Sequence, residues 1–188
     1  RIDGPRWERA LLTELEDEAA RLGPRPLGSL FFGGGTPSLM DPATTARIIE
    51  RARALFPTDS APEISLEANP TTVEAAKLAD FRAAGVERLS IGVQALDDAS
   101  LAALGRAHSV AEALDAIGNA RSIFPRMSFD LIYARPDQTM AGWMAELDRA
   151  LDLAADHLSL YQLTIDPGTA FHTRHARGGL VLPEDDAA

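Results

Sequence analysis

The fold is decided by the stretch Leu30-Phe31-Phe32-Gly33-Gly34-Gly35-Thr36-Pro37-Ser38, near the start of the chain. Its apolar run is short and ends at a glycine breaker, which predicts a buried strand rather than a helix. Glycines at the end of a strand let the backbone turn sharply and present bare N–H and C=O groups to a ligand. The same stretch also fits a strand-to-helix turn that binds nothing, so its meaning depends on how the later strands end.

Strand and helix patterns alternate along the chain around this stretch. Apolar runs bounded by turn residues predict five strands, over residues 30–32, 62–66, 88–93, 127–132 and 157–163. Helical spacing and capping signals predict helices over residues 7–22, 42–56, 71–85, 98–104, 109–123 and 139–153. Such alternation implies right-handed crossovers and a parallel sheet with helices outside it.

The order of these elements fits either an open doubly wound sheet or part of a (β/α) barrel. Because the first helix precedes every visible strand, one further strand upstream would complete another βα unit. We therefore expect an α/β fold that is a partial TIM-like barrel of parallel strands, incomplete at both ends. No linker divides the chain, so residues 1–188 are predicted to form a single domain.

Local signals mark several helix starts. Asp41, followed by a proline, is typical of an N-cap with proline at the first helical position. Capping boxes are predicted for Thr71 with Glu74 and for Ser109 with Glu112.

Composition and charge exclude several classes of protein. The chain has 188 residues, of which 46% are hydrophobic and 24% charged, as in soluble globular proteins. Its net charge of -10 and the lack of a Lys/Arg cluster argue against nucleic-acid binding. No apolar run of roughly 18 residues predicts a membrane span, and no secretory signal opens the chain, which favours the cytoplasm. There are no cysteines, so these residues form neither a disulfide nor a cysteine-ligated metal site.

Polar groups stand where the predicted strands end. They are Gly33-Gly34-Gly35-Thr36, Glu67, Gln94, Asp130 and residues 161–164, with Arg106 one short helix beyond Gln94. In a parallel sheet they gather at one edge, where α/β proteins bind ligands. The set offers carbonyls and a carboxylate for an ammonium group, a guanidinium for a carboxylate, and a second carboxylate for a ribose diol. An amino acid joined to a nucleoside satisfies all of them, and S-adenosylmethionine (SAM) is one such molecule, although not a unique solution.

Each of these residues also has a structural interpretation. Glu67 could brace a turn, Gln94 could be a core amide, and Arg106 could be an ordinary surface arginine. Asp130 lies inside an apolar strand, where an unpaired carboxylate is costly, so a bound partner is favoured for it more than for the others. The prediction of a site therefore rests on their joint placement.

Several motifs together resemble one family in order and spacing. They are Phe32-Gly33-Gly34-Gly35-Thr36-Pro37-Ser38, Glu67-Ala68-Asn69-Pro70, Arg88-Leu89-Ser90-Ile91-Gly92-Val93-Gln94, Leu104-Gly105-Arg106-Ala107-His108 and Phe129-Asp130-Leu131-Ile132-Tyr133. Over nearly its whole length the chain resembles the oxygen-independent coproporphyrinogen III oxidase group of radical SAM proteins. Residues 159–169 resemble in particular the haem-chaperone (HemW-type) branch of that group.

The resemblance implies a set of ligand contacts. The methionine ammonium end of SAM would be held by Gly34, Gly35, Thr36 and Glu67, its carboxylate by Arg106, its ribose by Gln94 and Asp130, and its adenine by the backbone of Thr164. In the family a Cys-x-x-x-Cys-x-x-Cys loop holds a 4Fe-4S cluster, which needs cysteine thiolates. Because this chain has none, we expect the loop upstream of Arg1, a further family segment beyond Ala188, and no radical activity from these residues alone.

Two further features bear on the resemblance. Residues 134–138 read Ala-Arg-Pro-Asp-Gln where many relatives resemble Gly-Leu-Pro-Gly-Gln, which questions the shape of this loop rather than the ligand set. Haem needs an axial ligand, and the chain has four histidines, His108, His157, His172 and His175. We assign none of them to haem, because a loop histidine is usually no ligand, and expect the haem contacts mostly outside this chain.

Three functions from different classes follow. The first is a haem chaperone that carries SAM, the cluster and haem and delivers haem to a client protein, with any membrane contact made through that client. The second is an oxygen-independent enzyme that decarboxylates coproporphyrinogen III, in which the cofactor supplies the difficult chemistry. The third is a (β/α) domain whose glycine turn binds an unrelated phosphate ligand, which the acidic company of Arg106 disfavours. Residues 159–168 favour the first over the second.

Overall fold

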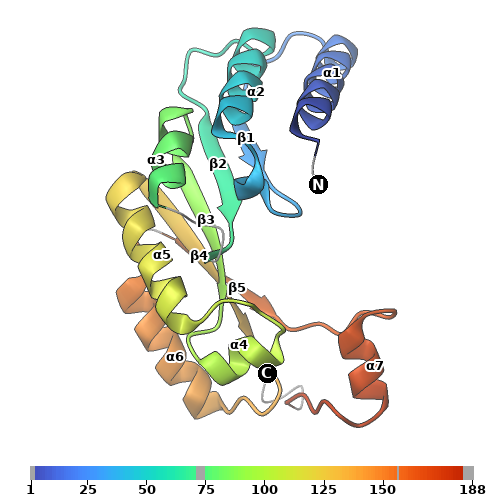
Figure 1. Cartoon of the computed structure of the whole chain (residues 1–188), viewed down its shortest axis with the longest axis vertical. Helices are drawn as coiled ribbons and strands as arrows, with labels where there is room; N and C mark the ends of the chain where they lie inside the picture. The colour runs from blue at the N-terminus through green and yellow to red at the C-terminus, as the bar shows by residue number, and fades with distance from the viewer. Residues whose placement is uncertain (1–2, 71–74, 156, 184–188) are drawn as a thin grey trace.

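The computed structural model describes residues 3–70, 75–155 and 157–183. In it, five strands form one parallel sheet, and each strand pairs with the next along the chain (Figure 1). The strands are β1 (Ser29–Phe32), β2 (Glu63–Ala68), β3 (Arg88–Gln94), β4 (Arg126–Tyr133) and β5 (His157–Gln162). A doubly wound sheet reverses its strand order at a switch point, whereas this order never reverses. The arrangement is that of a barrel wall, so the predicted partial barrel is confirmed over the doubly wound alternative.

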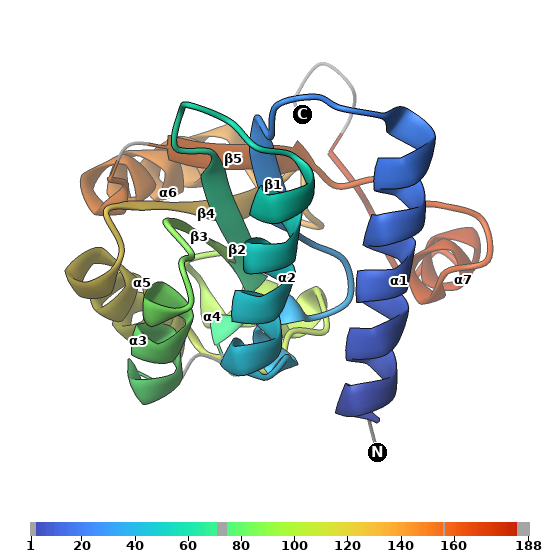
Figure 2. The same ribbon diagram turned by 90° about the horizontal axis from the view of Figure 1, so that it is seen from above.

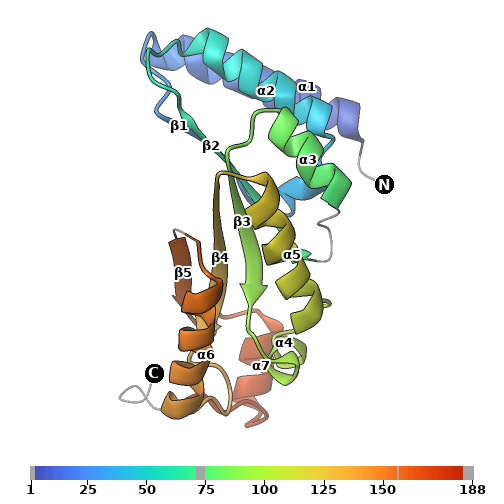
Figure 3. The same ribbon diagram turned by 90° about the vertical axis from the view of Figure 1, so that its left-hand side faces the viewer.

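Most of the helices follow one another along one side of this sheet (Figures 2 and 3), whereas the last helix lies apart from them, on the opposite side of the strands in Figure 1. They are α1 (Gly4–Leu22), α2 (Pro42–Leu55), α3 (Ala75–Ala83), α4 (Asp98–Ala103), α5 (Val110–Ile123), α6 (Met140–Leu153) and α7 (Ala170–Ala176). A 3-10 turn, η1 (Pro37–Leu39), follows β1. The hydrophobic core lies between α2, α3, α5, α6 and the strands, and it includes fully buried Phe81, Ile117 and Phe129.

The predicted caps explain where most helices begin. The Asp41 side chain accepts a hydrogen bond from the Ala43 N–H, and Ser109 and Glu112 form the expected capping box at the start of α5. The capping box expected for Thr71 with Glu74 lies outside the described residues. The sequence interpretation missed two short elements, η1 and α7, because each is shorter than the periodicity that reveals a helix.

The strands alternate between an apolar and a polar face. Side chains on the helix side, such as Leu66, Leu89 and Phe129, are fully buried. The opposite side, hereafter the polar face, carries Glu63, Ser65, Glu67, Arg88, Ser90, Arg126, Ser128, Asp130 and Ser159. β1 is an edge strand, and the prediction that it is buried is wrong for Phe31, which is 59% exposed, because Phe31 lies on the polar face beside Ser65 while Leu30 and Phe32 face the core.

Helix α1 packs on α2 through ion pairs, and its Leu12 side chain contacts the hydrophobic core. None of its residues is buried, and it packs against α2 through Glu8 with Arg47 and through Glu16 with Arg51. The Arg47 and Thr44 hydrogen bonds lower the pKa of Glu8 to about 2. Although α1 has 19 residues, neither it nor any other helix in the described ranges is long and apolar enough to cross a bilayer.

Candidate functional site at the carboxyl ends of the strands

The glycine loop after β1 is tied to the end of β2. Gly34 donates its backbone N–H to the Glu67 Oε2 atom at 3.0 Å, and the Asn69 amide donates to the Thr36 hydroxyl at 3.4 Å. Gly34 and Gly35 have φ of 79° and 61°, in the left-handed region that residues other than glycine adopt only at a cost in free energy. A Cβ atom on Gly33 would lie 2.7 Å from the Phe31 ring. The sequence needs its glycines here because the loop must turn tightly and lie against Glu67.

Asp130, on β4, is the centre of a charged cluster. It receives a hydrogen bond from Ser159 on the neighbouring strand, and Glu67, His157 and Arg106 all act on it electrostatically. Burial raises the pKa of Asp130 above its usual value, the Ser159 bond partly offsets this, and the Glu67 carboxylate adds to the rise. Two carboxylates therefore face the same space, which favours a ligand that brings hydrogen-bond donors or positive charge.

Arg106 supplies the opposite charge of this cluster. It is half-buried, and burial lowers its pKa below the usual value while the Asp130 carboxylate acts in the other direction. Within the described ranges, no residue forms a hydrogen bond with its guanidinium group. A half-buried guanidinium with free donors can take a carboxylate in the bidentate geometry that arginine favours.

Gln94 ends β3 in a strained conformation. Its φ is 76°, which is uncommon for a residue with a side chain, and the residue is only 7% exposed. A Cβ atom on Gly92 would lie 3.0 Å from the Gln94 Nε2 atom, so the side chain folds back over Gly92. Gly92 comes two residues after Ser90 and therefore lies on the same face of the strand. The Gln94 amide, which lies over Gly92, is on the polar face too. Backbone strain of this kind clusters at functional sites.

Thr164 is the last predicted site residue, and the histidines lie at different places in the fold. Thr164 is exposed, two residues beyond β5, where the Leu163 N–H donates to the Tyr133 carbonyl at 2.9 Å. His108 is buried, with its Nε2 atom 2.9 Å from the Val93 carbonyl, so it braces the strand next to Gln94. His175 pairs with the Leu180 carbonyl at 3.0 Å. His157 opens β5, at the opposite end of the strand from Thr164.

The amino end of the polar face holds a second cluster that sequence reasoning missed. Glu63 forms ion pairs with Arg88, at 3.4 Å, and with Arg126. Arg88 also donates to the Ser128 hydroxyl at 3.3 Å, and that hydroxyl bonds Ser90 at 3.2 Å. These contacts join β2, β3 and β4 across the sheet. The period-two alternation of charged residues in the strands is the signal that could have revealed them.

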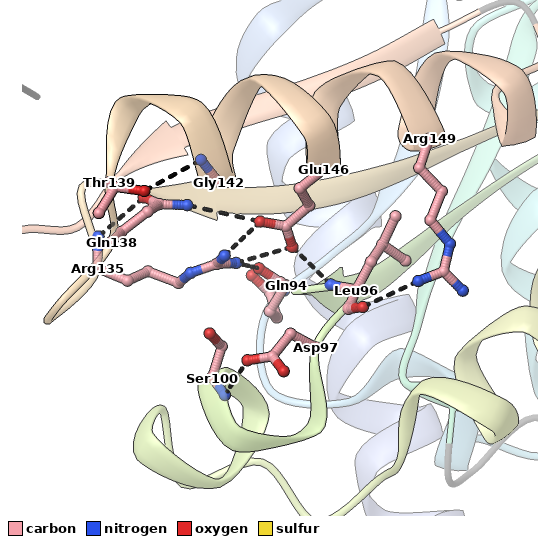
Figure 4. A network of polar contacts seen from close by, with 10 residues as sticks. All are labelled: Gln94, Leu96, Asp97, Ser100, Arg135, Gln138, Thr139, Gly142, Glu146 and Arg149. Atoms are coloured by element: carbon pink, nitrogen blue, oxygen red, sulfur yellow. Dashed lines mark hydrogen bonds and ion pairs between the residues drawn. The ribbon is translucent and has the colours of Figure 1, made fainter.

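A third polar group, also missed, surrounds Arg135 (Figure 4). The Arg135 side chain is 6% exposed and forms a bidentate ion pair with Glu146 on α6. Ala134 and Asp137 stand at the two glycine positions of the Gly-Leu-Pro-Gly-Gln pattern described above, and they have φ of 56° and 59°. The loop thus adopts left-handed conformations at both substituted positions.

A large cavity lies away from the predicted site. It has a volume of about 780 Å³ and lies between α4, the start of α6 and the segment after α7, with Ser100, Arg135 and Leu180 in its lining. None of the eight predicted site residues lines it. The structure brings Gly34, Glu67, Arg106 and Asp130 together with Gln94 at the carboxyl end of the polar face, apart from this cavity.

Comparison with known proteins identifies the family. Residues 3–150 match the family described as the radical SAM superfamily. The chain is 43% identical over 190 residues to the cattle (Bos taurus) protein "Radical S-adenosyl methionine domain-containing protein 1, mitochondrial", covering 100% of this chain and 42% of the relative. It is 40% identical over 178 residues to the Escherichia coli protein "Heme chaperone HemW", covering 94% of this chain and 46% of the relative.

Among solved structures, the chain resembles coproporphyrinogen III oxidase (HemN) from Escherichia coli, a radical SAM enzyme. The TM-score is 0.79 at 28% identity, covering 98% of this chain and 42% of that one. Archaeal Elp3 from Methanocaldococcus infernus shares the fold, with a TM-score of 0.71 at 16% identity, covering 92% of this chain and 45% of that one. The chain thus spans less than half the length of the proteins it matches.

Proposed function

Because the chain belongs to the radical SAM superfamily, we propose that it forms the SAM-binding part of a haem chaperone. The observation that carries the proposal is the half-buried Arg106 guanidinium beside Asp130, with Glu67 close by. A positive group and two carboxylates in one place suit a ligand that carries both a carboxylate and an ammonium group. The 40% identity to a protein named a haem chaperone supports this choice of function.

The residues present fit SAM. Glu67 gives one carboxylate oxygen to the Gly34 N–H, and its second oxygen can accept from the ligand ammonium group. Arg106 suits the ligand carboxylate, and Asp130 and Gln94 suit the ribose hydroxyls as acceptors. Thr164 is proposed to meet the adenine through its backbone. When bound, SAM would supply radical chemistry, and these side chains would orient it.

The iron–sulfur cluster has no such fit within these residues. Clusters of the radical SAM type need cysteine thiolates, and the chain has no cysteine. We therefore propose that any cluster is held by residues other than these 188.

Decarboxylation of coproporphyrinogen III is the second candidate. The specific observation in its favour is the likeness to HemN, at 28% identity and a TM-score of 0.79. A phosphate-binding domain is disfavoured, because Glu67 and Asp130 would repel an anion at the ligand edge. Haem or a porphyrin is the proposed cargo or substrate, and a haem-receiving client is the proposed partner. The predicted cytoplasmic location stays a proposal, since the cattle relative is named as mitochondrial.

The test uses the gene product at its natural length, reduced and loaded with its cluster. It is given coproporphyrinogen III and SAM without oxygen, and porphyrins and 5′-deoxyadenosine are followed by chromatography. The same batch is titrated with haem. We expect stoichiometric haem binding and no conversion of the porphyrinogen. Formation of protoporphyrinogen would favour the decarboxylase over the chaperone. If the protein neither binds haem nor converts the porphyrinogen, both functions are rejected.

A further inference from the structure

The segment that leaves β3 is held by side chains from a distant part of the chain (Figure 4). The Arg135 Nη1 atom donates to the Gln94 carbonyl at 3.3 Å, and the Leu96 N–H donates to the Glu146 Oε1 atom at 2.6 Å. Arg149 donates to the Leu96 carbonyl at 3.1 Å. The backbone on both sides of Ala95 is therefore held by the β4–α6 loop and by α6. We call Arg135, Glu146 and Arg149 the clamp.

The clamp acts at a strained residue. Gln94 keeps a φ of 76° although it is not glycine, so without support its backbone would relax toward negative φ. Such a relaxation would rotate the Gln94 side chain away from the polar face, where it now lies over Gly92. The clamp contacts are thus placed where they can set the direction of a proposed ligand-binding side chain.

The clamp is not arranged for stability alone. The Arg135 side chain is 6% exposed, yet its Nε atom has no hydrogen-bond partner among the described residues. An unpaired buried donor costs free energy, and buried ion pairs can often be replaced by apolar residues without loss of stability. The Arg135 guanidinium group instead donates hydrogen bonds to both Glu146 and the Gln94 carbonyl. A lysine ammonium group cannot reproduce this planar, two-partner geometry.

We propose that Arg135 and Glu146 are positioning residues for SAM, which act by holding Gln94 in its strained conformation. This inference rests on the proposed function, because it requires Gln94 to contact the ribose. It adds to that function a determinant of SAM affinity, located in the loop of residues 134–138. If Arg135 and Glu146 served folding alone, the conservative variant Arg135→Lys, which keeps the charge opposite Glu146, would bind SAM as tightly as the parent.

The test measures SAM binding by equilibrium dialysis on the cluster-loaded, natural-length protein. Arg135→Lys and the double variant Arg135→Leu/Glu146→Leu are compared with the control Arg51→Lys, which alters an exposed ion pair with Glu16. We expect both clamp variants to raise the SAM dissociation constant by about tenfold and the control to leave it unchanged. Thermal unfolding and hydrogen exchange of the Leu96 amide are recorded on the same samples, and this exchange should accelerate in the clamp variants even without SAM.

Each outcome has a distinct meaning. If folded Arg135→Lys binds SAM as tightly as the parent, Arg135 contributes an ion pair only and the inference is wrong. If the double variant does not fold, Arg135→Lys alone decides. If the parent itself binds no SAM while its cluster is intact, the proposed function fails, and the inference fails with it for that separate reason.

Discussion

The two ends of the polar face contain similar residues in opposite states. At the amino end, Glu63 is paired with two arginines, and Arg88 extends the network to Ser128. At the carboxyl end, Asp130 and Glu67 oppose each other, and Arg106 makes no hydrogen bond with the described residues. The first cluster satisfies itself, whereas the second leaves charge and donors for another molecule.

This difference separates structure from function on one surface. A network whose charges are paired needs no ligand, and its loss should be felt in folding. A cluster in which burial raises the pKa of an acid and lowers the pKa of a base is destabilising until a ligand completes it. Similar residues at two ends of the same strands thus predict different consequences when they are changed.

The largest effect is expected at Arg106. We predict that Arg106→Met weakens SAM binding by about 100-fold, because a carboxylate would lose a bidentate, partly desolvated partner. The stability of the protein should stay the same or rise slightly, since an unpaired half-buried charge is removed. Isothermal titration calorimetry and thermal unfolding measure the two quantities. A variant that unfolds readily but binds SAM normally would assign Arg106 to the structure instead.

The matched change at the other end should show the reverse. Arg88→Met removes one of the two ion pairs of Glu63 and the bond to Ser128, and we expect a loss of about 1 kcal/mol in the free energy of unfolding. SAM affinity should not change. Urea unfolding with a parallel SAM titration tests this. Weakened SAM binding without lost stability would show that the two ends are not separate.

The smallest effect concerns pH and Asp130. Because the folded-state pKa of Asp130 is raised, its ionisation costs stability, so stability should fall as the pH rises from the ordinary aspartate value through the raised one. SAM affinity should rise several-fold over the same interval, because the ribose hydroxyls need an ionised acceptor. Asp130→Asn should flatten both curves.

NMR titration of the carboxyl groups measures this directly, and Glu8 is the internal reference. The pKa of Glu8 is lowered to about 2 by Arg47 and Thr44, so its titration midpoint should lie below the ordinary glutamate value, whereas that of Asp130 should lie above the ordinary aspartate value. Parallel stability curves for the parent and Asp130→Asn would contradict the assigned desolvation of Asp130.

The sequence was enough to predict a parallel sheet and the gathering of the residues at its strand ends along one edge. Strand ends can be located from breakers, as at Gly33 and Asn69, and a parallel sheet then brings those ends together. The exposure of Phe31 could not be predicted in this way, because an apolar side chain on an edge strand looks the same in sequence as a buried one. The resemblance, rather than periodicity, provided the specific role of each site residue.

Contacts between distant residues were beyond the sequence patterns. Glu63 and Arg126 are 63 positions apart, and Glu146 meets Leu96 across 50 positions. Neither pair has a local signature, since the register of neighbouring strands and the rotation of α6 decide them. The strained φ of Gln94 was hidden for the same reason, because it depends on what holds the residue from outside its own strand.

The pairing of Arg135 with Glu146 also constrains how this loop can change during evolution. An arginine at position 135 without its glutamate would leave an uncompensated buried charge, at a cost of about 3–5 kcal/mol. A glutamate at position 146 without its arginine would do the same. A single substitution that removes the charge of one partner should therefore give a poorly folded protein, whereas a paired exchange to apolar residues should not. We expect the two positions to change together.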